Sequence, residues 1–272
     1  MNFVISSNDN PTYIGFLSKV CEYYKTLGHN VYVAYLSDKN PPKINCDNIL
    51  QINPISGFDS GVQAKLARTY AACNMEHGVY TLLDVDQIVI NINWLNEIIE
   101  KNKDSIINED KDIIAIGANG YRNTLQDGKW PMYFTTSTPG GFRKLVGIPA
   151  GDSFQNFIEK FSTITDPIDT YECTRNRFDS FSDESLFRYC ANKNNNLKII
   201  HEKWDGFHQQ KSSRRIDRTD KPLWEQKKLT EDQRKKILDG FFLDCFPARP
   251  YEQYQSLIDD IIETSLEYNE NS

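Results

Sequence analysis

The spacing of hydrophobic residues changes regularly between strand-like and helix-like along the first 120 residues. Short apolar or alternating runs, which are typical of strands, occupy residues 3–5, 30–36, 49–52, 79–83 and 113–116. Between these runs, apolar residues recur every three or four positions, which predicts helices over residues 11–27, 60–71 and 94–100. Strands that alternate with helices predict an α/β fold with a mixed, mostly parallel sheet flanked by helices.

The remainder of the chain is less regular, and residues 120–180 give the weakest pattern. Apolar spacing predicts helices at residues 154–161, 183–192 and 254–266 and a strand at residues 197–200. A polar and basic loop is expected at residues 205–221. Thr230 opens a capping box ahead of a further short helix. We expect one α/β domain over residues 1–221, with a helical C-terminal extension over residues 222–272 packed on it.

Composition narrows the classes of function. The 272 residues carry a net charge of −7, and a general nucleic-acid-binding surface needs a basic face, so nucleic acid is excluded as a partner. No stretch approaches the roughly 18 apolar residues of a transmembrane helix. The six cysteines form no CxxC pair, which is typical of reduced thiols in a cytoplasmic protein. Peripheral contact with a membrane stays open.

Two aspartates carry the clearest chemistry. Asp84 and Asp86 follow the buried run at residues 79–83, and a second apolar run begins at Ile88. In open α/β sheets, ligands bind beyond the carboxyl ends of the strands, and extended backbone would direct both side chains to one side. Two adjacent carboxylates favour a shared cation, and Mn²⁺ or Mg²⁺ also binds substrate phosphates. The alternative is a solvated turn with two surface aspartates.

This arrangement resembles the GT-A glycosyltransferases, in which a Rossmann-like β-α-β half precedes a strand that ends in a DxD motif. The resemblance is strongest over residues 1–120 and 180–220. It implies a donor-binding half at about residues 1–120 and an acceptor half at about residues 121–221. It also implies a metal-dependent transferase that moves a sugar from a nucleotide-diphosphate sugar to a hydroxyl of a glycan or glycoconjugate.

The same resemblance implies roles for residues of the donor half. Ser6 and Asn8, at the end of the first strand, correspond to positions that hold the base and ribose. Lys65 and Arg68 share one face of the helix before the DxD strand and correspond to basic residues that contact the nucleotide or its phosphates. A solvated helix face is the other interpretation of Lys65 and Arg68.

Three further groups lie in the second half. Asp183 or Glu184, at a helix start, corresponds to the general base of inverting enzymes, although acids in a first helical turn also serve as caps. His208 corresponds to a third metal ligand, and His201 is its rival. A basic cluster follows, which suits a diphosphate or an acidic lipid headgroup: Lys211, Arg214, Arg215 and Arg218.

Other functions stay open at this stage. An inverting mechanism is favoured by the acidic pair, whereas a retaining enzyme would need no base. A Mg²⁺-dependent nucleotidyltransferase also uses carboxylates at strand ends, but it usually has a glycine-rich loop, and residues 6–11 contain no glycine. An inactive carbohydrate-binding protein on a GT-A-like fold is the non-enzymatic alternative. We also expect residues 205–218 to form a mobile lid over the donor.

Overall fold

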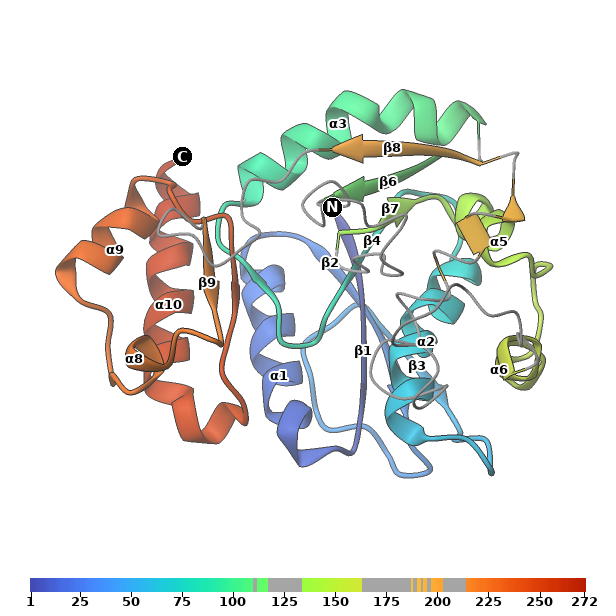
Figure 1. Cartoon of the computed structure of the whole chain (residues 1–272), viewed down its shortest axis with the longest axis horizontal. Helices are drawn as coiled ribbons and strands as arrows, with labels where there is room; N and C mark the ends of the chain where they lie inside the picture. Colours follow the sequence, from blue (N-terminus) through green and yellow to red (C-terminus); the bar gives the residue numbers. More distant parts are fainter. Residues whose placement is uncertain are drawn as a thin grey trace.

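The computed structural model describes residues 1–109, 112–116, 134–162, 187, 190–191, 193–194, 197–202 and 214–272. Within this part of the chain, the main feature is a seven-stranded sheet with helices on both faces (Figure 1). Its strands are β1 (Asn2–Asn8), β2 (Asn30–Leu36), β3 (Asn48–Ile52), β4 (Tyr80–Leu83), β6 (Asp112–Ile116), β7 (Thr136–Ser137) and β8 (Lys198–Glu202). Their order is β3-β2-β1-β4-β7-β6-β8, and every neighbouring pair is parallel except the two that include β7.

The helices cover the sheet in two layers. One layer contains α1 (Pro11–Thr26), α3 (Ile92–Glu109) and α10 (Tyr251–Asn271), and the other contains α2 (Ser60–Cys73), α5 (Pro139–Val146) and α6 (Phe154–Ser162). Each layer buries its own apolar core. Strand β1 contributes to both cores, because successive side chains of a strand point to opposite faces: Phe3 and Ile5 pack in one core and Val4 packs in the other.

Local signals explain where the helices begin and end. The side chain of Asn10 accepts a hydrogen bond from the backbone N–H of Thr12 at 2.9 Å, so it caps α1 as predicted. Asp59 caps α2 in the same way through the N–H of Val62, also at 2.9 Å. The turn after α1 contains Gly28 with φ +76°, a conformation that glycine adopts without strain.

A second, three-stranded sheet joins distant parts of the chain. It is built from β5 (Ile88–Val89), β10 (Asp244–Phe246) and β9 (Arg215–Asp217), in that order. Strand β10 runs antiparallel to β5 and parallel to β9. The predicted loop at residues 205–221 therefore contains a strand, and the C-terminal extension is not helical throughout.

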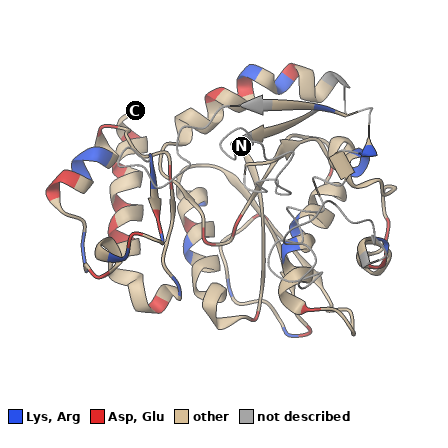
Figure 2. Ribbon diagram, in the orientation of Figure 1, with Lys and Arg blue, Asp and Glu red and all other residues tan. Residues whose placement is uncertain are grey.

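The C-terminal segment otherwise follows the prediction. It contains α8 (Lys221–Trp224), α9 (Glu231–Leu238) and α10, and the capping box at Thr230 is formed. Apolar residues of α10, among them Leu257, Ile258 and Ile261, pack in the same core as α1. Helix α9 carries charges of both signs (Figure 2), with acids in its first turn and lysines in its last, and Lys236 pairs with Asp232. No described helix is long and apolar enough to cross a membrane.

The predicted fold class is confirmed by this architecture: a mostly parallel sheet, flanked by helices and followed by a largely helical C-terminal segment. The domain boundary at residue 222 stays a prediction.

Candidate functional site

The candidate site lies where the order of the strands reverses. Strand β1 is the centre of the parallel half of the sheet, with β2 and β3 on one side and β4 on the other. Such a switch point opens a crevice beyond the carboxyl ends of the strands, where α/β proteins bind ligands. Ile5 pairs with Leu83, so the residues that follow them in the chain, Ser6 in β1 and Asp84 just after β4, begin this edge. The sequence placed both residues in the site.

Asp84 is held by a buried arginine of α2. Nη1 of Arg68 lies 2.5 Å from Oδ1 of Asp84, and the Arg68 side chain is only 3% exposed. Burial by itself would raise the pKa of Asp84, but the charge and hydrogen bond of Arg68 outweigh this effect. The charges of Arg218 and Arg249 lower the pKa further. The pKa of Asp84 is therefore lowered from its usual value. Lys65, on the same helix, is half-buried.

Asp86 lies in a tight turn and not in extended backbone. The N–H of Gln87 donates to the carbonyl of Asp84 at 3.1 Å, which closes the turn directly after β4. The side chain of Asp86 is 1% exposed, and its Oδ2 faces two arginines. Nη1 of Arg218 lies 3.2 Å away, and Nε of Arg249 donates to the same oxygen. The alternative of two solvated surface aspartates does not describe this pair.

The small sheet brings these two arginines to the turn. Arg218 follows β9 directly, and Arg249 lies three residues after β10. Behind them, the fully buried Asp244 of β10 accepts hydrogen bonds from Nε and Nη2 of Arg215, and Gln87 donates to it at 3.3 Å. Burial raises the pKa of Asp244 above its usual value, although Arg215 opposes this shift. Arg215 is therefore a largely buried, internal partner of Asp244.

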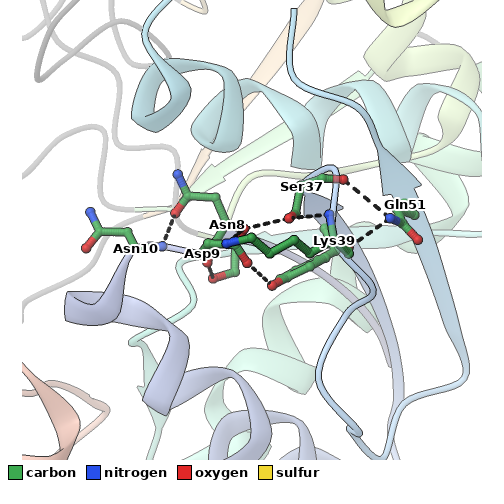
Figure 3. A network of polar contacts seen from close by, with 8 residues as sticks. Asn8, Asp9, Asn10, Ser37, Lys39 and Gln51 are labelled. Atoms are coloured by element: carbon green, nitrogen blue, oxygen red, sulfur yellow. Dashed lines mark hydrogen bonds and ion pairs between the residues drawn. The ribbon is translucent and has the colours of Figure 1, made fainter.

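A second polar cluster lies at the ends of β1 and β2 (Figure 3). Asp9 accepts hydrogen bonds from Tyr35 at 2.5 Å and Ser37 at 2.6 Å, and Lys39 lies 3.7 Å from it. These bonds, that of Ser37 foremost, lower the pKa of Asp9. Asn8 accepts a hydrogen bond from the N–H of Asn10 at 3.2 Å. The sequence pointed to Ser6 and Asn8 but missed Asp9, whose partners come from the end of β2 and the residues just after it.

The other predicted residues do not gather here. Nε and Nη2 of Arg214 donate to the carbonyls of Phe241 and Gly240, so its contacts are with the turn after α9. The expected mobile lid over residues 205–218 is wrong for its last residues, because Arg215–Asp217 is a strand with a buried arginine. His201 lies in β8. Outside the described residues are Asp183, Glu184, His208 and Lys211.

The carboxylate oxygens at the turn suit a divalent cation. Hydrogen bonds from described residues reach Oδ1 of Asp84 and Oδ2 of Asp86, and none of them reaches the other oxygen of either carboxylate. Mg²⁺ is commonly held by one or two carboxylates, with water and substrate phosphates completing its shell. In the described part of the chain, no group of three or more His, Cys, Asp or Glu side chains could hold a metal ion. The two aspartates thus fit a cation whose remaining ligands come from water and a bound phosphate.

Comparisons with known proteins add a likeness in the arrangement of the backbone. No family model and no curated protein matches the chain. The chain is similar to the galactosyltransferase LgtC in complex with donor and acceptor sugar analogues, at 10% identity and a TM-score of 0.44, over 97% of this chain and 95% of that one. An active-site mutant of LgtC gives 12% identity and the same TM-score of 0.44, over 92% and 88% of the two chains. At this level of similarity nothing follows about chemistry, so function is inferred from the site.

Proposed function

We propose that this protein is a glycosyltransferase that moves a sugar from a nucleotide-diphosphate sugar to a hydroxyl of a glycan or glycoconjugate. One observation carries the proposal. Asp84 and Asp86 lie together at the switch point of the sheet, in a turn where three guanidinium groups converge on them. Carboxylates that fit a divalent cation, beside arginines that suit phosphate, form a site for a diphosphate.

Each part of the site has a role in this proposal. Ser6, Asn8 and Asp9 offer polar groups for the base and ribose of the donor. Asp84 and Asp86 hold the divalent cation, Mn²⁺ or Mg²⁺. When bound, such a cation acts as a Lewis acid that neutralises the charge of the departing diphosphate.

The acceptor side rests on residues outside the described part of the chain. Asp183 or Glu184 takes the proton of the acceptor hydroxyl if the enzyme inverts, and a retaining enzyme needs no such base. His208 is the proposed third metal ligand. An inverting mechanism therefore depends on one of these two acids.

The loop after β1 favours glycosyl transfer over nucleotidyl transfer. A phosphate-binding loop presents free backbone N–H groups and positive potential to its ligand. Here the loop begins with the carboxylate of Asp9, which is ionised at neutral pH and whose pKa is lowered further by its hydrogen bonds. A negative charge at this position disfavours a triphosphate and suits hydrogen-bonding to hydroxyl groups.

Calorimetric titration of UDP and GDP tests the proposal directly. We expect one of them to bind in the presence of Mn²⁺ and to bind more weakly in EDTA. Asp84→Asn should lower the Mn²⁺-dependent affinity by at least about tenfold, as loss of a charged ligand predicts. Asp47→Asn is the matched control, because Asp47 is bound by Lys25 at the opposite end of the sheet and should leave the affinity unchanged. Equal affinities of the wild type and Asp84→Asn would contradict the proposal.

A further inference from the structure

The arginines at Asp86 are more exposed to solvent than the carboxylate that they contact. Asp86 is almost completely buried, whereas the side chains of Arg218 and Arg249 are 28% and 26% exposed. The two arginine side chains therefore contact a buried carboxylate and are themselves partly open to water. An anion that approaches the turn from solvent can therefore contact these arginines directly.

Both arginines are also held by contacts that do not involve Asp86. The guanidinium of Arg249 lies 4.4 Å from the centre of the Tyr13 ring, and its Nη1 donates to the hydroxyl of Tyr13 at 2.5 Å. The guanidinium of Arg218 lies 5.1 Å from the centre of the Phe246 ring. Aromatic faces attract cations. The arginines would therefore stay near the turn if Asp86 released them.

Without a cation, the charges of the side chains at the turn favour an anion. Arg68, Arg218 and Arg249 bring three positive charges to the two carboxylates, and Arg218 and Arg249 act on Asp84 as well as on Asp86. The cluster is thus positive by one charge before any ligand binds. Guanidinium groups bind phosphate oxygens and carboxylate oxygens with the same fork of N–H donors, so a phosphate can replace a carboxylate at such a group.

We propose that Arg218 and Arg249 bind the diphosphate of the donor and that Asp86 occupies them while the site is empty. This inference rests on the proposed function. Asp86 is then an internal competitor of the diphosphate, as well as a ligand of the cation. When a cation takes up the charge of Asp86, its hold on the arginines weakens and they become available to the phosphates, so cation and diphosphate strengthen each other's binding. Linkage requires this coupling to be reciprocal.

The decisive variant is Asp86→Asn, titrated with inorganic pyrophosphate in EDTA. If Asp86 were only a metal ligand, its replacement would bring no gain of affinity for pyrophosphate in EDTA. Competition predicts the opposite: without metal, Asp86→Asn should bind pyrophosphate about 5- to 150-fold more tightly than the wild type, the usual range for coupled sites. Added Mn²⁺ should strengthen binding to the wild type more than to the variant.

Two controls separate competition from a general effect of buried charge. Asp260→Asn removes another buried carboxylate that pairs with an arginine, Arg234 at 2.5 Å, but it lies in α10 and should give no gain. The double variant Asp86→Asn with Arg249→Gln should lose the gain. Affinity in Asp86→Asn that equals or falls below that of the wild type would overturn the inference.

A variant that fails to fold still leaves the inference testable. Arg249→Gln in the wild-type background should then weaken UDP or GDP binding in Mn²⁺ by about tenfold or more, as expected for a lost charged hydrogen bond. Unchanged binding would reject the role of Arg249. The proposed function is tested separately. If Asp86→Asn gains affinity for pyrophosphate but no nucleoside diphosphate binds the wild type, the competition at the arginines is supported and the glycosyltransferase function is rejected.

Discussion

Replacing Arg215 by methionine tests how the C-terminal segment supports the site. Arg215 donates to the fully buried Asp244 through Nε at 3.0 Å and Nη2 at 2.6 Å, and its guanidinium lies 4.2 Å from the centre of the Phe246 ring. Methionine keeps the length and the apolar contact but removes the charge. Asp244 would then stay in the interior with Gln87 as its remaining side-chain donor among the described residues.

The expected loss of stability is large because a buried charge is left without its partner. Breaking a buried ion pair costs about 3–5 kcal/mol. With a urea m-value of about 3 kcal/mol per M, the unfolding midpoint should fall by about 1–1.7 M. The double variant Arg215→Met with Asp244→Leu should recover most of this loss, because no buried charge remains.

The pH dependence supplies an independent check. Burial raises the pKa of Asp244, and loss of Arg215 should raise it further. A carboxyl with a raised folded pKa holds its proton in the folded state at a pH where the unfolded chain has lost it. The loss of stability in Arg215→Met should therefore be greatest at neutral pH and shrink as the pH falls toward about 4, the unfolded value.

Urea unfolding at several pH values, followed by far-UV circular dichroism, measures all three effects. Lys25→Met is the matched control: its partner Asp47 is partly exposed, so the loss should stay below about 1 kcal/mol. The reasoning is refuted if Arg215→Met costs no more than this control, or if the double variant is as unstable as the single one.

Two further predictions concern the donor and the base. Arg68→Ala should lower the melting temperature and nucleotide binding together, since it leaves Asp84 without its buried partner, whereas Lys65→Ala should leave the melting temperature nearly unchanged; melting curves with and without UDP or GDP distinguish the two. Asp183→Asn should reduce transfer by roughly two to four orders of magnitude with donor binding intact, as loss of a general base predicts; near-normal turnover would move that role to Glu184 or favour retention.

The sequence predicted the parallel half of the fold because its signals are local. Strands β1, β2 and β4 span four to seven residues and each contains a short apolar run, and caps such as Asn10 and Asp59 mark the helices between them. The position of Asp84 beyond β4 followed from the same pattern. A buried strand with polar residues at its end can be recognised from the sequence without knowing which strands lie beside it.

The small sheet could not be predicted in this way. Strands β5, β9 and β10 have two or three residues each, which is too short for any periodicity, and they come from distant parts of the chain. Arg249 was missed for this reason: it lies beyond residue 240 and meets Asp86 only because β10 pairs with β5. An arginine close to two prolines, Pro247 and Pro250, was the only local signal.

Turnover of nucleotide sugars tests the central claim most directly. The measurement is release of nucleoside diphosphate from a panel of UDP- and GDP-sugars in Mn²⁺, for the wild type and for Asp84→Asn. We predict release from at least one donor, with loss of most of that activity in Asp84→Asn and in EDTA. Absence of release from every donor, or release that Asp84→Asn leaves unchanged, would contradict a nucleotide-sugar site at this turn.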